Sequence, residues 1–210
     1  MNLFQLMKKE MEQSREYRIP FSRFMELVLY HPVEGYYMRS RPKLGKSGDF
    51  FTNAHVGSVF GQTLCRLFLQ MVTEVEKPWA LVEIGSGDGL LIEQMCVEFI
   101  KLGVDPTSVH LYLIETSPYH QELQKERLSG YPFSIKWASR VSDIPSYPYS
   151  MVYSNELVDA LPVHRVKRVS EEEIAEIYIT VDLDNHQLIE LDRPVSDPQL
   201  IAFLEQFEYS

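Results

Sequence analysis

Glycines stand at every second position in one short stretch of this 210-residue chain, at Gly85, Gly87 and Gly89. They follow the apolar run 80–84, which contains an acid, Glu83. Glycine permits positive φ and close approach of a ligand, and the helix expected next offers free backbone N–H groups. The spacing predicts a strand, a tight turn and a helix that together bind a nucleotide-like cofactor.

The type of cofactor follows from the glycine spacing. A dinucleotide fingerprint, G-x-G-x-x-G, needs a third glycine where this sequence has Leu90, which disfavours a nicotinamide-dependent oxidoreductase. The spacing G-x-G-x-G after an acid fits S-adenosylmethionine better, because no pyrophosphate has to be bound and Glu83 can meet the ammonium group of the ligand. Glu115 ends the next apolar run, where an acid can accept the ribose hydroxyls. The alternative interpretation is that Glu83 and Glu115 are ordinary strand-end charges.

Three polar residues after the apolar run 150–154 are candidates for the transfer step: Asn155, Glu156 and Asp159. Methyl transfer is an in-line displacement in which the protein mainly aligns the nucleophile with the sulfur. A guanidinium acceptor needs carboxylates that hold it and take up the proton that its nitrogen loses. We assign a catalytic role to these three residues. The alternatives are a strand-end cap for Asn155 and a surface charge for Asp159.

Strands and helices alternate around these residues, which predicts a parallel sheet with right-handed crossovers. After Pro162 the pattern changes to antiparallel strands with a turn at 182–185, followed by a helix that Asp197 caps. The expected parallel strands are 80–84, 109–115, 133–138 and 150–154, the expected helices between them are 88–102 and 118–128, and the expected antiparallel strands are 163–169, 174–181 and 187–191.

The part of the chain before the glycine turn is expected to be helical. An amphipathic helix opens the chain, Ser22 caps a second helix, and a third helix over 53–76 carries an apolar stripe expected to be core packing. The basic stretch 39–48 is typical of a loop. Composition alone favours a solvated loop there, with Asp49 or Thr52 capping the next helix, over a lid at the edge of the cofactor.

Composition disfavours several classes of protein. The net charge of −10 argues against non-specific binding to nucleic acid. The N-terminus lacks the apolar run of a signal peptide and no apolar stretch has transmembrane length, so we expect a soluble, cytoplasmic protein that does not bind a membrane. The two cysteines, Cys65 and Cys96, match no zinc pattern and are expected to be reduced core thiols, and no metal site is expected.

Several short motifs follow one another along the first three quarters of the chain. They are Gly48-Asp49-Phe50-x-Thr52, Phe60-Gly61, Glu83-x-Gly85-x-Gly87-x-Gly89, Glu115-x-Ser117-Pro118, the stretch from Ser154 to Val163, and the stretch from Phe21 to Tyr37 ahead of them. Together they resemble the MidA-like class I methyltransferases, a family that includes a mitochondrial complex I assembly factor that methylates an arginine of a complex I subunit.

The resemblance implies a seven-stranded methyltransferase fold, S-adenosyl-L-methionine as cofactor and a protein arginine as substrate. It also implies that Gly48, Asp49, Phe50 and Ser117 help to form the cofactor pocket. This favours the lid over the solvated loop for the segment around Asp49.

The resemblance further implies three more sheet strands after the antiparallel part, so the chain is expected to be truncated at its C-terminus. The sheet edge would then be uncovered, and a second copy of the chain, in a homodimer, is one way to cover it. A cofactor-binding or assembly module without activity is therefore the alternative function. The expected fold class is α/β, with an N-terminal helical segment packing on the core (1–78), an incomplete Rossmann-like class I methyltransferase sheet (79–162), and an antiparallel insert with a terminal helix (163–210).

Overall fold

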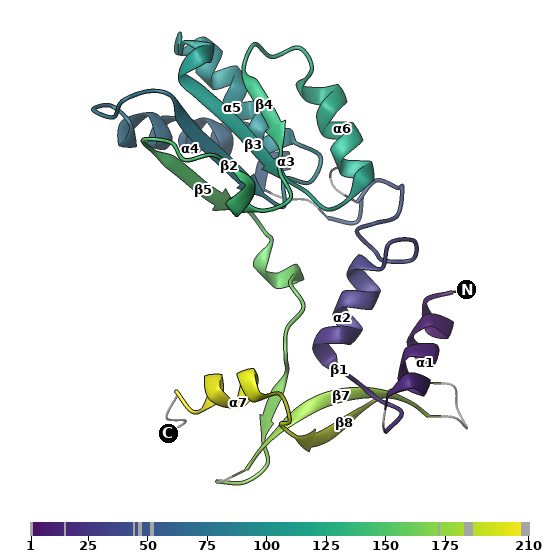
Figure 1. Ribbon diagram of the computed structural model, residues 1–210. Helices are drawn as coiled ribbons and strands as arrows, with labels where there is room; N and C mark the ends of the chain where they lie inside the picture. Colours follow the sequence, from purple (N-terminus) through teal and green to yellow (C-terminus); the bar gives the residue numbers. More distant parts are fainter. Residues whose placement is uncertain are drawn as a thin grey trace. The chain divides into compact units, whose positions relative to one another are not determined.

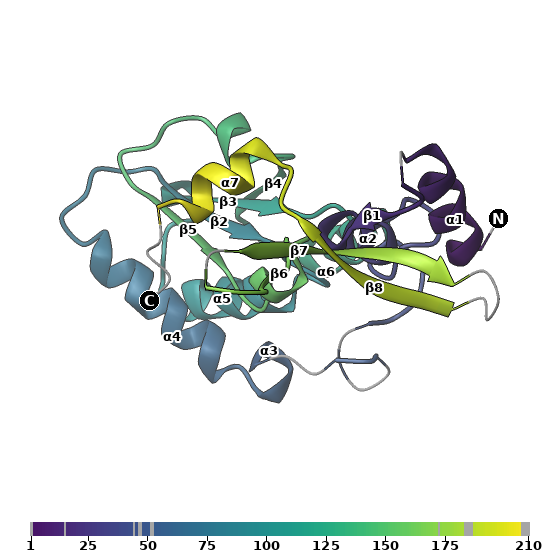
Figure 2. The same ribbon diagram turned by 90° about the horizontal axis from the view of Figure 1, so that it is seen from below.

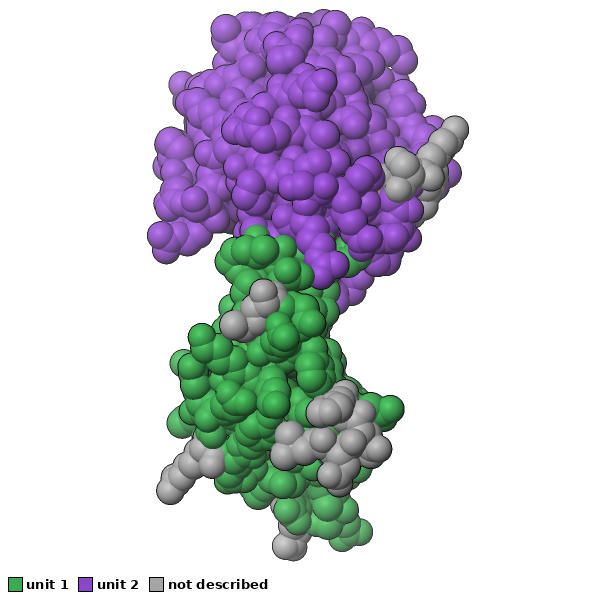
Figure 3. All heavy atoms as spheres, turned by 90° about the vertical axis from the view of Figure 1, so that its right-hand side faces the viewer, with its two compact units in different colours: residues 1–36, 161–210 green, residues 37–160 purple. Residues whose placement is uncertain are grey.

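The computed structural model describes residues 2–14, 16–43, 45, 48–50, 53–171, 173–182 and 187–206. Two units divide the chain, one formed by residues 37–160 and the other by residues 1–36 together with 161–210 (Figure 3). Each unit is described by itself.

Four parallel strands form the sheet of the 37–160 unit, as predicted (Figure 1). They are β2 (Trp79–Ile84), β3 (Val109–Ile114), β4 (Ser134–Trp137) and β5 (Ser150–Ser154). Their order is β4-β3-β2-β5, so the chain runs outward from β2 to β4 and then returns to the other side of β2. Open α/β sheets bind their ligands where the strand order reverses in this way, beyond the carboxyl ends of the strands. In this unit that place lies after β2 and β5.

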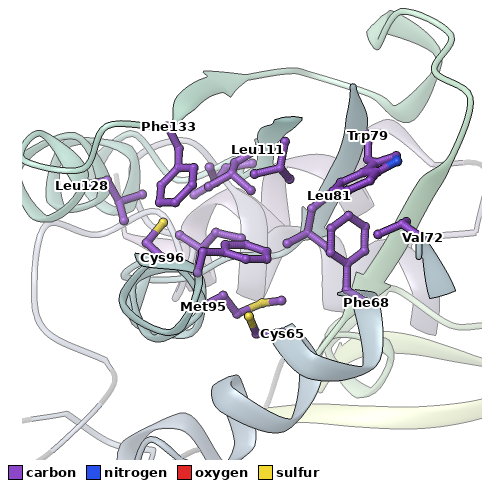
Figure 4. Packing of buried hydrophobic residues seen from close by; sticks show 14 residues of the cluster. Cys65, Phe68, Val72, Trp79, Leu81, Met95, Cys96, Leu111, Leu128 and Phe133 are labelled. Carbon is purple, nitrogen blue, oxygen red and sulfur yellow. The ribbon is translucent and has the colours of Figure 1, made fainter. Parts of the chain in front are cut away.

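Helices cover one face of this sheet. They are α4 (Val59–Met71), α5 (Leu90–Lys101) and α6 (Pro118–Leu128), and their apolar side chains pack with those of β2 and β3 in one buried cluster (Figure 4). Cys65 and Cys96 are buried free thiols in this cluster, as predicted. Because α5 follows the glycine turn directly and packs in this cluster, the cluster also supports the turn.

The other face of the sheet is covered without an α-helix by the connection from β4 to β5. This connection contains only a short 3-10 turn, η2 (Val141–Asp143), and its Ile144 and Tyr147 pack against Val82 and Tyr112. The Tyr147 hydroxyl also lies 2.6 Å from the hydroxyl of Tyr112. Two more 3-10 turns, η1 (Pro106–Ser108) and η3 (Val158–Ala160), precede β3 and end the unit.

The unit made of residues 1–36 and 161–210 is built on a second, antiparallel sheet (Figure 2). Its central strand pairs with the three others, and the side chains of Met7, Met11 and Leu27 pack against Ile179 and Val181. Its elements are α1 (Leu3–Gln13), β1 (Ile19–Pro20), α2 (Phe21–Tyr30), β6 (Val166–Arg168), the central β7 (Ile174–Asp182), β8 (Gln187–Pro194) and α7 (Pro198–Leu204). The terminal helix is capped by Asp197, as predicted, since its side chain accepts from the Gln199 amide.

The structure differs from the expected arrangement of the N-terminal segment 1–78. The segment is divided between the two units at Tyr36, because α1 and α2 pack on β7 whereas α4 packs on the parallel sheet. The short strand β1, which pairs with β7, was not predicted. Pro20, not Ser22, occupies the cap position of α2, so the predicted cap is wrong.

The single long helix expected over 53–76 is also wrong. It is two helices, α3 (Asn53–Val56) and α4, separated at Gly57, whose flexible backbone disfavours a helix interior. Val56 and Val59 flank this break and are 77% and 72% exposed, so these two members of the predicted apolar stripe do not pack in the core. Most of the predicted turn at 182–185 lies outside the described residues.

Candidate functional site

The glycine turn after β2 has the backbone that only glycine adopts easily. Gly85, Gly87 and Gly89 have φ of 70°, 52° and 79°, in the left-handed region. Space is restricted as well, because a Cβ on Gly85 would lie 2.7 Å from a methyl carbon of Leu157. Gly89 ends the turn and α5 begins at Leu90, two residues after the predicted start at Asp88.

Glu115 reaches from the end of β3 to this turn. Its carboxylate accepts the Gly87 amide at 2.9 Å and the Ser117 amide at 2.8 Å. A carboxylate has about four acceptor positions, so these two bonds orient Glu115 and leave acceptor capacity for a ligand. Ser117 precedes α6, and its buried hydroxyl oxygen has no hydrogen-bond partner among the described residues. The structure therefore brings Gly87, Glu115 and Ser117 together.

Glu83 lies inside the protein at the level of the glycine turn. It is 3% exposed, and its Oε2 has no hydrogen-bond partner among the described residues. Burial raises the pKa of Glu83 to about 8; a hydrogen bond with Tyr153 opposes this shift, and the nearby carboxylates of Asp88 and Glu115 add to it. A buried polar atom without a partner is rare and requires an explanation, and a ligand donor would supply one.

Two residues that the sequence interpretation missed hold the turn from α6. Gln124 is fully buried, and its amide nitrogen donates to the Gly87 carbonyl at 2.6 Å while the Trp137 indole donates to its oxygen at 2.7 Å. The guanidinium of Arg127 donates to the Asp88 carbonyl at 2.9 Å and to the Asp88 carboxylate at 3.0 Å. Their three-residue spacing on one helix was the available signal, but nothing local shows that this face meets the glycine turn.

The segment before α3 forms a small backbone-paired loop. The Phe50 amide donates to the Lys43 carbonyl and the Gly45 amide donates to the Phe50 carbonyl, both at 2.9 Å. The Gly48 amide donates to the Gly45 carbonyl at 3.0 Å, and Asp49 forms an exposed ion pair with Arg41.

His55 of α3 lies between this loop and the glycine turn. Gly45 lies against the ring of His55, and that ring is 3.6 Å from the Asp88 carboxylate in the turn. Phe50 is 51% exposed. Thr52 lies outside the described residues.

The segment after β5 that carries the predicted polar residues approaches the glycine turn through Leu157, which packs on Gly85. Glu156 is exposed, has a φ of 50°, and accepts the Asn53 amide at 3.3 Å. Asp159 is exposed and contributes to the raised pKa of Tyr37, whose main cause is burial. A non-glycine residue in the left-handed region is strained by roughly 1–3 kcal/mol, and such strain often marks a functional site.

Asn155, the third predicted catalytic residue, is half-buried at the tip of β5. Within the described part of the chain, no group of three His, Cys, Asp or Glu residues could hold a metal ion. The described helices are also all too short or too polar to cross a membrane.

Residues 63–210 match the sequence profile of a family described as "Putative S-adenosyl-L-methionine-dependent methyltransferase". The chain belongs to this family. The predictions of the family and of an α/β methyltransferase fold are thus confirmed.

The comparison with solved structures supports the same family. A protein from Burkholderia thailandensis, crystallised bound to S-adenosyl-homocysteine, has a TM-score of 0.78 and 26% sequence identity to this chain. The match covers 98% of this chain and 53% of that protein.

The curated relatives are named mitochondrial protein arginine methyltransferases, NDUFAF7. The Xenopus laevis protein is 29% identical over 177 residues, which are 73% of this chain and 40% of the relative. The human protein is 29% identical over 188 residues, which are 78% of this chain and 42% of the relative. The chain therefore spans less than half the length of these relatives.

Proposed function

We propose that this chain binds S-adenosyl-L-methionine at the glycine turn and transfers its methyl group to a protein arginine. The buried, unpartnered Oε2 of Glu83 carries the proposal, because it is an acceptor that awaits a donor inside the turn. The ammonium group of the cofactor is such a donor, and a cation there would also offset the cost of ionising a buried carboxyl. The solved relative bound to S-adenosyl-homocysteine supports this assignment.

Each residue of the cofactor site has one role in this proposal. Glu83 accepts the ammonium group, and Glu115 accepts the ribose hydroxyls with the acceptor capacity that Gly87 and Ser117 leave to it. Gly85, Gly87 and Gly89 let the backbone approach the amino-acid part of the cofactor, and Gly48, Asp49, Phe50 and Ser117 line its edge.

The transfer step requires little chemistry from the protein, because the bound cofactor supplies a methyl group on a good leaving group. Asn155 and the carboxylates of Glu156 and Asp159 orient the acceptor guanidinium, and a carboxylate takes up the proton that the attacking nitrogen loses. The arginine acceptor rests on the names of the NDUFAF7 relatives. A cytoplasmic location and a homodimer belong to the same proposal; they stay predictions, to be checked by fractionation and sedimentation.

Cofactor binding is tested by calorimetry with S-adenosylhomocysteine and, separately, NAD. We expect the first ligand to bind and the second not to bind. Gly87→Val should abolish binding, because valine is strained at a φ of 52°. Gly130→Val is the matched control, since a Cβ there meets no atom within 4 Å. Failure of the wild-type chain to bind S-adenosylhomocysteine would contradict the proposal.

A cofactor-binding module without turnover is the second candidate, and the four-stranded parallel sheet among the described residues favours it. Transfer of a labelled methyl group to arginine-containing proteins separates the two candidates. The double variant Glu156→Gln, Asp159→Asn should lower the rate at least about 100-fold, the usual contribution of general base catalysis. Full activity in that variant would remove the roles given to these two acids.

A further inference from the structure

Lys43 is a buried lysine in the loop before α3, and its ammonium group is fully engaged inside the protein. The residue is 1% exposed. Its Nζ donates to the backbone carbonyls of Arg39 at 2.6 Å and Arg41 at 3.3 Å, and lies 5.1 Å from the centre of the Tyr119 ring. An ammonium has three N–H donors, and two carbonyls and one ring face account for them. Lys43 is therefore placed to hold the chain rather than to bind a ligand itself.

The backbone of Lys43 holds the other half of the same loop. Its carbonyl accepts the Phe50 amide at 2.9 Å, and Phe50 in turn accepts the Gly45 amide. One residue thus fixes Arg39 and Arg41 through its side chain and Phe50 through its backbone. Tyr119 is the second residue of α6, so the ammonium also ties this loop to the helix that follows Glu115.

The charge of Lys43 acts on the cofactor site. Burial lowers the pKa of Lys43, the guanidinium of Arg41 lowers it further, and the Glu115 carboxylate acts in the opposite direction. The Lys43 ammonium and the Glu115 carboxylate therefore attract one another. Among the described residues, the groups that face the ammonium are Arg41 from the loop, Glu115 from the end of β3 and the Tyr119 ring from α6.

We propose that Lys43 is a positioning residue for a nucleoside-containing ligand: it fixes the Phe50 segment against α6 and supports the carboxylate of Glu115 that accepts ribose hydroxyls. The second half of this statement rests on the proposed role of Glu115. The first half concerns the ligand-free protein alone, so the two can fail separately.

The experiment compares Lys43→Met and Lys43→Arg with wild type. Lys125→Met is the matched control, because Lys125 is an exposed lysine of α6 that pairs with Glu122. Hydrogen exchange of the Phe50 amide in the ligand-free protein reports the loop, and calorimetry with S-adenosylhomocysteine reports the site. In Lys43→Met we expect Phe50 exchange to rise and affinity to fall, each by about tenfold, the equivalent of roughly one lost hydrogen bond. Lys43→Arg should restore affinity, and Lys125→Met should change neither.

A pH series separates charge from packing. Wild-type affinity should fall as pH rises through the lowered pKa of Lys43, whereas Lys43→Arg, which stays charged, should lose less over the same range. The ammonium of the ligand titrates in both proteins, so the difference between the curves reports residue 43.

Unchanged Phe50 exchange in Lys43→Met would overturn the anchoring role. Parallel pH curves for wild type and Lys43→Arg would overturn the electrostatic role. If Lys43→Met does not fold, Tyr119→Leu tests the same contact by removing the ring, and unchanged exchange and affinity there would count against the proposal. Failure of the wild type to bind S-adenosylhomocysteine would refute the proposed function, while Phe50 exchange would still decide the anchoring.

Discussion

Glu83 is an acid in a place where its charge is costly. Its pKa in the folded protein is raised to about 8 by burial, against an ordinary value of 4.5. Between these two values the folded protein holds a proton that the unfolded chain has released. The contribution of Glu83 to the free energy of unfolding is therefore fully present below about pH 4.5 and is lost as pH rises toward 8.

Replacing Glu83 tests this dependence. In urea denaturation between pH 5 and 7, the free energy of unfolding of the wild type should carry a downward contribution of up to about 1.4 kcal/mol per pH unit from Glu83. Glu83→Gln should remove that contribution. The exposed acid Glu122 supplies the control, as Glu122→Gln should keep the wild-type slope. Equal slopes in the wild type and Glu83→Gln would show that Glu83 titrates normally.

The proposed contact between Glu83 and the ammonium group predicts that cofactor binding releases a proton. At pH 7 the ligand-free Glu83 is largely protonated, and an ammonium group placed beside it favours the ionised form. Calorimetry of S-adenosylhomocysteine binding in two buffers of different ionisation enthalpy should show proton release by the wild type and less release by Glu83→Gln. Equal release in both proteins would place the ammonium elsewhere.

Elements whose signals are local were predictable from the sequence. The predicted bounds of α6 and β5 are those of the structure, because Ser117-Pro118 marks a helix start and the apolar run before Asn155 marks a strand. The break at Gly57 was missed because an apolar stripe continues across it. Gln124 and Arg127 were missed because their role depends on where α6 lies in the folded unit, which periodicity does not encode.

The close packing of α4 against α5 depends on the absence of a side chain at Gly61. A Cβ on Gly61 would lie 2.6 Å from the Gln94 Cβ, while Gln94 itself donates to the Ala54 carbonyl at 2.8 Å. Gly61→Ala should therefore destabilise the protein by about 1–3 kcal/mol from overpacking, although alanine favours helix. Gly57→Ala is the control, since a Cβ there meets nothing within 4 Å. Urea unfolding measures the stability of both variants. Equal unfolding midpoints for Gly61→Ala and Gly57→Ala would mean that the two helices move apart easily to make room for the added methyl group.

At the scale of the whole molecule, every residue assigned to the cofactor and to the transfer step lies in the contiguous unit 37–160. The buried cluster that supports the glycine turn also comes from this unit alone, from Cys65 to Phe133. The other unit is discontinuous, since β1 near the N-terminus pairs with β7 after residue 161, so it needs both ends of the chain.

This division predicts that a fragment of residues 37–160 folds and binds S-adenosylhomocysteine by itself. Its affinity should lie within about threefold of the whole chain, a difference of less than roughly 1 kcal/mol, because no assigned contact is removed. Circular dichroism checks folding, calorimetry measures binding, and the fragment carrying Gly87→Val should not bind. A fragment that folds but binds at least about 100-fold more weakly would contradict this prediction.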